Sequence, residues 1–143
     1  MDRPKKVSTA LKLLYVAFVL SVINVILNIP IEERSLLQGG INYGSTFTGF
    51  FIGTVIFVSI CSLAFLAFLI YKIRKGRNWA RITFLVISAI GIPFSIFSVI
   101  ASLTINPFPE ILSIIEIILE ITAIVLLFQK KSSEWFNLMK KTK

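Results

Sequence analysis

Four apolar runs constrain this chain more than any other feature, because each is longer than the ~18 residues that a membrane-spanning helix requires. They predict spans at about 7–29, 46–71, 79–104 and 110–128. Of the 143 residues, 56% are hydrophobic, more than a soluble domain of this size could bury. We therefore predict an all-α integral membrane four-helix bundle, a single domain over residues 1–143, with the lipid bilayer as its surroundings.

The positions of the basic residues predict the orientation of these spans. Of the fifteen Lys and Arg residues, four lie before or early in the first span, five lie in or just after the 72–78 turn, and five follow the fourth span. Arg34 alone lies elsewhere. Basic residues gather on the cytoplasmic side of membrane proteins, so we expect two helical hairpins with both termini in the cytoplasm. The net charge of +8 follows this pattern and predicts no nucleic-acid partner.

The connections between the spans carry turn signals. Residues 30–45 contain Pro30 and several glycines, which predict a polar loop. In the 72–78 turn, Gly76 suits a helix C-cap and Asn78 suits the N-cap of the next span.

The tail over residues 130–143 predicts a basic amphipathic segment. A helix there would place Trp135, Leu138 and Met139 on one face, in the headgroup region of an anionic leaflet. A frayed, charged tail is the alternative. Trp79 and Trp135, which both follow basic residues, are expected to be interfacial anchors.

Two acidic residues interrupt the fourth apolar run. Glu116 and Glu120 are four residues apart and therefore point to one face of a helix. At a rise of about 1.5 Å per residue, they lie roughly 9 and 15 Å from the start of the span. Because a carboxylate at this depth is costly in lipid, both should face the interior of a bundle and be paired or protonated.

The first span offers partners for these carboxylates. Asn24 lies near the depth of Glu116, Ser21 lies nearer that of Glu120, and Lys12 is placed to form an ion pair with Glu120. Three interpretations remain open. The polar residues form structural hydrogen bonds between helices, they bind a cation or a proton, or they contact a basic residue in a partner's transmembrane helix.

The third span contains a proline near its middle. Gly91 and Pro93 predict a kink, and the backbone carbonyl that the proline frees is either satisfied by neighbouring helices or available to an ion. A polar stripe on the same span favours hydrogen bonds between helices over a conduit. The stripe consists of Ser88, Ser95, Ser98 and Ser102.

The second span begins with small residues at intervals of four. Ser45, Gly49 and Gly53 form a groove that allows another helix to approach closely. That helix belongs either to the same bundle or to another protomer.

Catalytic and metal-binding patterns are missing from the sequence. The chain has no histidine and one cysteine, Cys61, and it contains no HExxH, GxSxG or Gly-rich phosphate loop. We therefore predict a protein that is not an enzyme, with no metal and no cofactor.

One segment resembles a known group of proteins. Residues Lys75-Gly76-Arg77-Asn78-Trp79-Ala80-Arg81-Ile82, followed by Gly91-Ile92-Pro93, are similar to a segment of small uncharacterised bacterial four-helix inner-membrane proteins. The resemblance implies a location in the bacterial cytoplasmic (inner) membrane and implies no activity.

Two functional hypotheses follow. The first is a non-enzymatic membrane protein that binds another membrane protein, as an accessory subunit or as an immunity-type protein. The alternative is an oligomeric small transporter or channel, coupled to a cation or to protons, in which Glu116 and Glu120 form the site. Because a bundle of four helices is expected to have little interior space, the alternative requires a homodimer or a larger oligomer.

Overall fold

The computed structural model describes residues 3–38, 44–103 and 107–141, apart from the side chains of 30–38, 44–46 and 141. This part of the chain is helical and contains no strand. All of its helices except the last are long and apolar enough to cross a membrane, which confirms the prediction of an all-α chain with four candidate spans. The helices are α1 (Lys5–Gln38), α2 (Gly44–Arg74), α3 (Asn78–Ser102), α4 (Pro107–Phe128) and α5 (Lys130–Lys141).

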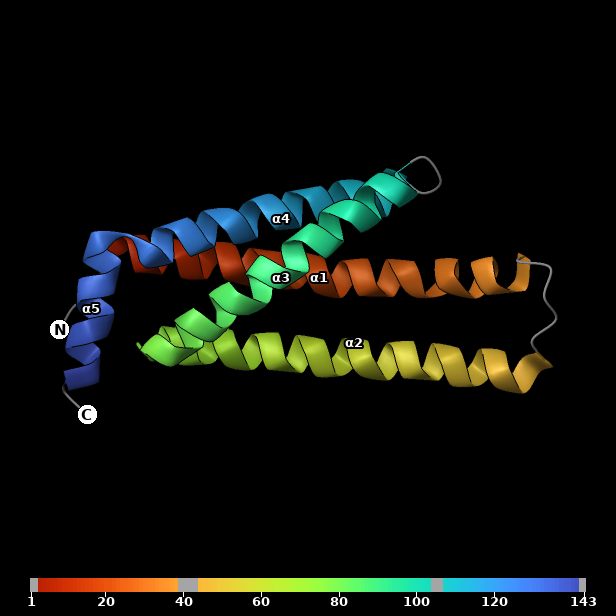
Figure 1. Cartoon of the computed structure of the whole chain (residues 1–143), viewed down its shortest axis with the longest axis horizontal. Coiled ribbons are helices and arrows are strands. Elements are labelled where there is room, and N and C mark those ends of the chain that lie inside the picture. The colour runs from red at the N-terminus through yellow and green to blue at the C-terminus, as the bar shows by residue number, and fades with distance from the viewer. Residues whose placement is uncertain (1–2, 39–43, 104–106, 142–143) are drawn as a thin grey trace.

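The four long helices run roughly along one axis (Figure 1). One end of the molecule holds both termini, α5 and the turn between α2 and α3, and we call it the terminus end. We call the opposite end the loop end. Within the described residues, α1 packs against α4 and α2, and α3 packs against α4 and α2, but no Cα atoms of α1 and α3, or of α2 and α4, lie within 8 Å of each other. The helices therefore form a ring around a central space.

The hydrophobic core fills this space only at the terminus end. Its side chains come from all five helices, and Phe136 of α5 is fully buried among them. α5 turns across the ends of the long helices and closes this end of the ring (Figure 1). The core includes Val7, Leu11, Leu14, Leu69, Ile73, Phe84, Leu127 and Phe136.

A glycine terminates α2, as the sequence predicts. Gly76 has a φ of 73°, its N–H donates to the carbonyl of Ile73 at 2.9 Å, and the N–H of Arg77 donates to the carbonyl of Lys72 at 3.1 Å. This is the Schellman pattern of a helix end. The expected N-cap is wrong by one residue, because Asn78 is the first residue of α3 and Arg77 occupies the cap without a side-chain hydrogen bond.

The first helix is longer than predicted. α1 continues through Pro30 to Gln38, so the predicted polar loop over residues 30–45 is wrong for its first nine residues. Proline removes one helical hydrogen bond, whereas the residues that follow it, among them Glu32, Glu33 and Leu36, are mostly good helix formers.

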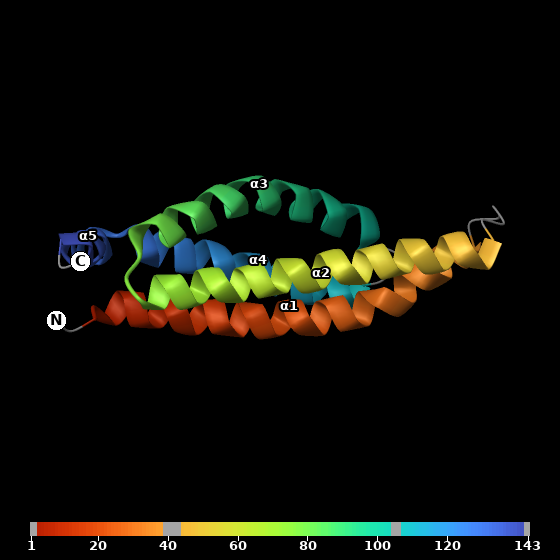
Figure 2. The same ribbon diagram turned by 90° about the horizontal axis from the view of Figure 1, so that it is seen from below.

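The third helix is bowed. Pro93 lies inside α3, and Figure 2 shows the helix arching away from the others along its middle. Proline removes a backbone hydrogen bond and crowds the preceding turn, which bends a helix. In Figure 1, α3 starts beside α2 and ends beside α4, so α2 and α3 diverge toward the loop end.

Candidate functional site

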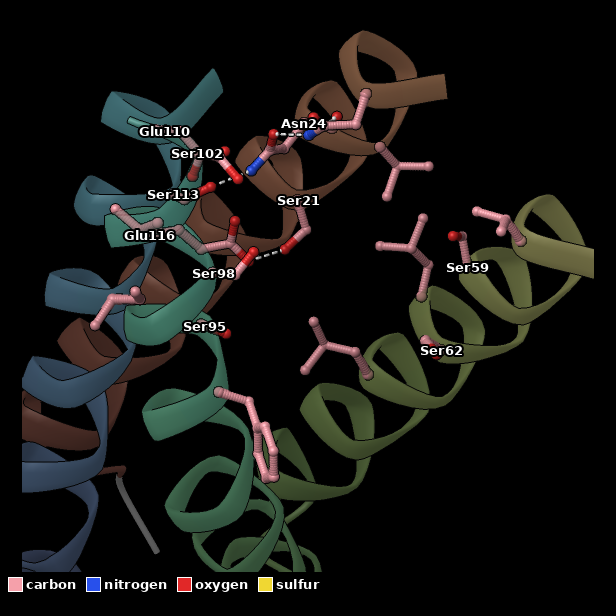
Figure 3. A pocket seen from close by; sticks show the side chains of 18 of the residues that line it. Ser21, Asn24, Ser59, Ser62, Ser95, Ser98, Ser102, Glu110, Ser113 and Glu116 are labelled. Atoms are coloured by element: carbon pink, nitrogen blue, oxygen red, sulfur yellow. Dashed lines mark hydrogen bonds between the residues drawn. The ribbon is translucent and has the colours of Figure 1, made fainter. Parts of the chain in front are cut away.

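A cavity of about 880 Å³ occupies the loop-end half of the ring. Each of the four long helices contributes one face to it, and Figure 3 shows the polar side chains that point into it. The charged residues in its described lining are all glutamates. The polar lining consists of Ser21, Asn24, Asn28, Ser59, Ser62, Ser95, Ser98, Ser102, Glu110, Ser113, Glu116 and Glu120.

The acidic wall of the cavity comes from one face of α4. Glu110, Ser113, Glu116 and Glu120 are spaced by three, three and four residues, and such spacings bring side chains to the same side of a helix. Pro107 opens the helix, where its missing N–H costs nothing, and Glu110 lies in the first turn, where the helix dipole favours a negative charge.

Two of the carboxylates form hydrogen bonds with side chains of neighbouring helices. The hydroxyl of Ser21 on α1 donates a hydrogen bond to Oε1 of Glu116, and the hydroxyl of Ser88 on α3 donates to Oε1 of Glu120. Ser21 therefore pairs with Glu116, although its depth in the sequence suggested Glu120. The side chain of Lys12 is exposed, and no ion pair with Glu120 is present among the described residues.

A chain of amides connects α1 to the first turn of α4. Nδ2 of Asn28 donates to Oδ1 of Asn24 at 2.6 Å, and Nδ2 of Asn24 donates to Oγ of Ser113 at 2.7 Å. Ser113 in turn donates to the carbonyl oxygen of Pro109 at 3.1 Å. Asn24 was expected at the depth of Glu116, and it lies one turn of α4 closer to the loop end.

Glu110 differs from the other two carboxylates. Its side chain is only 9% exposed and lines the cavity, yet no hydrogen bond or ion pair from the described residues reaches its carboxylate. Its oxygen atoms are not among the fully buried unpartnered polar atoms of the described residues, so the carboxylate can meet a ligand in the cavity. Glu110 is thus the carboxylate in this cavity to which the described part of the protein gives no partner.

The wall opposite α4 has a different character. α2 contributes mainly apolar side chains, with the hydroxyls of Ser59 and Ser62 among them (Figure 3), and α3 adds Phe94. The cavity therefore has an acidic, amide-rich wall on α1 and α4 and a largely apolar wall on α2 and part of α3. The apolar residues on α2 are Val55, Val58, Leu63 and Leu66.

A buried cation lies on the closed side of the cavity. Arg81 is 6% exposed, and its Nη1 donates to the carbonyl of Leu127 at 3.0 Å and to Oγ of Ser133 at 3.1 Å. Its guanidinium also lies over the rings of Phe128 and Phe136, at 4.5 and 4.7 Å. Arg81 thus caps the C-terminal end of α4, where the helix dipole favours a positive charge.

The tail helix packs differently from the sequence expectation. Trp135 was expected at the headgroups, but it is 6% exposed and packs with Met139 against Gly76, where an added Cβ would approach both side chains to 3.1 Å. Leu138, expected on the same face, is 43% exposed. The reason is that the adjacent aromatic pair Trp135 and Phe136 buries more apolar area in the core than the face through Leu138 would.

The remaining predicted residues lie outside the cavity. Trp79 is 46% exposed, with its ring 6.1 Å from that of Phe68. A Cβ added at Gly49, Gly53 or Gly91 would meet no atom within 4 Å, so no described helix packs closely on these glycines. Pro93 is exposed on α3, and the side chain of Ser45 lies outside the described residues.

Sequence reasoning missed several residues of the site. It predicted only the start of a span at Glu110, and it did not single out Asn28, Ser59, Ser62 and Ser113. The spacing of Glu110, Ser113, Glu116 and Glu120 is the signal that would have found the α4 wall. In the part of the chain that the structure describes, no group of three His, Cys, Asp or Glu side chains is arranged to hold a metal ion.

Comparisons of the chain with protein-family models, with curated proteins and with solved structures found no match. The cavity therefore carries the functional interpretation.

Proposed function

We propose that the chain is a multi-pass protein of the bacterial cytoplasmic membrane, with both termini in the cytoplasm. The support is the asymmetry of basic residues, of which only Arg34 falls outside the segments assigned to the cytoplasmic side. In this orientation the terminus end faces the cytoplasm, and the cavity lies in the outer half of the membrane.

The cavity binds a small cationic solute without changing it chemically, and the protein transports that solute. The observation that carries this proposal is a space of about 880 Å³ whose charged lining residues are Glu110, Glu116 and Glu120. Its volume falls within the ~300–1,000 Å³ typical of small-molecule sites. Serine and asparagine side chains add hydrogen-bonding groups, so a desolvated cation finds both charge and polar partners.

The asymmetry of the bundle supports transport rather than simple binding. The cavity lies in the loop-end half, whereas the core that includes Leu14, Phe84 and Phe136 closes the terminus end. A site that is sealed toward one side of a membrane is a feature of one state of an alternating-access cycle. The second state requires α5 and Arg81 to separate from the end of α4.

An oligomer is not required to build this site. A single bundle was expected to have little interior space, which made the transporter hypothesis depend on a homodimer. In this structure the four long helices of one chain line the cavity, where α3 bows and diverges from α2.

The proposal is tested by calorimetry on the protein in lipid nanodiscs, titrated with K⁺, Mg²⁺ and organic ammonium salts. At least one cation should bind, and Glu116→Gln, which keeps the shape of the side chain, should weaken binding about tenfold or more. Glu134→Gln is the matched control, because Glu134 is exposed on α5, away from the cavity. Absence of cation binding, or equal weakening by both variants, contradicts the proposal.

A second function is favoured by the free face of α2. Gly49 and Gly53 are exposed, with nothing within 4 Å of a Cβ at either position, so a helix of another membrane protein or of a second copy can approach there. This would make the chain an accessory or immunity-type protein. Gly53→Leu should leave the monomer stable and abolish association seen by cross-linking in membranes, and unchanged association contradicts this function.

A further inference from the structure

We infer that the ligand of the cavity is an organic ammonium with an apolar body, and that its nitrogen pairs with the carboxylate of Glu110. This inference rests on the proposed function and specifies the class of solute. It follows from two features of the cavity, an unpartnered carboxylate and two walls of opposite character.

The carboxylate of Glu110 indicates where the positive charge of the ligand lies. Glu110 is 9% exposed and lines the cavity, and no described residue gives it a hydrogen bond or an ion pair. Glu116 and Glu120, in contrast, each accept a hydrogen bond from the hydroxyl group of a serine. A protein fold that buries an ionised group normally pairs it. An ammonium group supplies both the opposite charge and the N–H donors that the described residues do not give to Glu110.

The surroundings of Glu110 suit an ammonium group. Asn24, Ser113 and Ser102 lie at the same end of the cavity (Figure 3). The oxygen atoms of Asn24 and Ser113 each already accept one hydrogen bond, and a second lone pair on each can accept another. Glu116 and Glu120, roughly two and three turns deeper, contribute a negative field to the site and position the helices through their serines. They are therefore positioning residues for this ligand, and Glu110 is the one that touches it.

The apolar wall indicates that the ligand also has an apolar part. Val55, Val58, Leu63 and Leu66 of α2 and Phe94 of α3 line the side of the cavity that faces α1 and α4. A bare inorganic ion would leave this wall and most of the 880 Å³ unused. An alkyl or aryl body of a few carbon atoms would cover the wall while its nitrogen reaches Glu110.

The test uses a tryptophan reporter on the apolar wall. A Phe94→Trp protein in phosphatidylcholine nanodiscs is titrated with ammonium, n-butylammonium and n-hexylammonium chloride, and the fluorescence of the new indole is followed. Affinity should rise about fourfold for each methylene added to the chain, as expected for methylenes withdrawn from water. Hexanol and hexanoate, which partition into lipid but lack the cation, should not compete.

Two further variants in the reporter background assign the contacts. Glu110→Gln should weaken hexylammonium binding about tenfold or more, whereas Glu134→Gln on the surface of α5 should not change it. Val58→Ser should reduce the dependence on chain length while leaving ammonium binding unchanged. Helical circular dichroism verifies folding, and Glu110→Asp, which shortens the side chain but keeps the charge, gives an intermediate affinity.

The outcomes separate this inference from the proposed function. Hexylammonium binding that is equal in the parent and in Glu110→Gln, or binding of K⁺ or ammonium as tight as that of hexylammonium, overturns the inference and leaves the cationic cavity in place. If no cation of any kind binds the parent protein, the proposed function falls, and this inference falls with it.

Discussion

The two halves of the ring are built from the same four helices, yet one is packed and the other is hollow. At the terminus end, the helices present Leu14, Leu69, Phe84 and Leu127 to the centre, and all are buried. At the loop end, α1 and α4 present serine, asparagine and glutamate, and α2 presents mainly apolar side chains, around a cavity of about 880 Å³. The outward surfaces of both halves are similarly apolar, so only the inward faces differ.

The contrast shows that apolarity alone does not pack a helix bundle in a membrane. Lipid tails are as apolar as leucine, so helices associate through close packing and through hydrogen bonds. The terminus end uses packing, with α5 as an additional layer. The loop end uses single polar links such as Ser21 to Glu116 and Asn24 to Ser113, which hold α1 near α4, whereas α2 and α3 diverge.

The greatest loss of stability is expected in the packed half. Phe136→Ala removes a fully buried ring from the core and should lower the free energy of unfolding by about 3–5 kcal/mol. Phe97→Ala is the matched control, because Phe97 is 75% exposed on the outer face of α3. Denaturation in mixed detergent micelles measures both. Equal losses in the two variants would show that the terminus end is not the packed half.

A smaller loss of stability is expected when the buried guanidinium of Arg81 is removed. Arg81→Met keeps the apolar stem but leaves the carbonyl of Leu127 and the hydroxyl of Ser133 without this donor, which should cost about 1–3 kcal/mol. The exposed Arg77 serves as the control in Arg77→Met. The same denaturation assay measures the stability of both variants. If Arg81→Met is as stable as the parent, Arg81 does not stabilise the packed terminus end.

The glycine turn should tolerate substitution poorly. Gly76→Ala forces a side chain into a left-handed backbone conformation, at a cost of about 1–2 kcal/mol. Its Cβ would also approach Trp135 and Met139 to 3.1 Å, so α5 should loosen. Faster proteolysis of the tail in Gly76→Ala, compared with Gly91→Ala in open space, is the measurement. Identical cleavage rates would contradict the packing of α5 on this turn.

The smallest loss of stability is expected in the hollow half. Ser21→Ala removes one hydrogen bond between α1 and α4 and should cost about 0.6 kcal/mol, the average for such bonds between membrane helices. Ser98→Ala, which removes a cavity hydroxyl without a described partner, should cost less still. If Ser21→Ala lowers the free energy of unfolding as much as Phe136→Ala does, the terminus end does not contribute more to stability than the loop end.

The sequence predicts the spans well because hydropathy reports directly on the surroundings of a helix. It also predicts the end of α2, since Gly76 is needed wherever the backbone turns left-handed. It fails at Pro30, where the local breaker signal is outweighed by the helix formers that follow. It also does not predict that Trp135 joins the core, because that contact involves residues far away in the sequence.

The candidate site could be predicted only in part. The spacing in α4 places the carboxylates on one inward face, but it does not specify which helix they meet, because depth in a membrane leaves the rotation and order of the helices open. Ser88 rather than Lys12 is therefore the partner of Glu120. The separation of α2 from α3 depends on how far α3 bows at Pro93, which no local pattern states.

The most direct test of an acidic cavity open to the outer side is the reactivity of single cysteines in intact membranes. In a Cys61→Ser background, Ser98→Cys is placed in the cavity and Leu14→Cys in the packed core, and both are treated from outside with charged methanethiosulfonates. We predict that Ser98→Cys reacts, faster with the cationic reagent than with the anionic one, and that Leu14→Cys does not. Equal protection of both positions, or faster anionic labelling of Ser98→Cys, would contradict such a cavity.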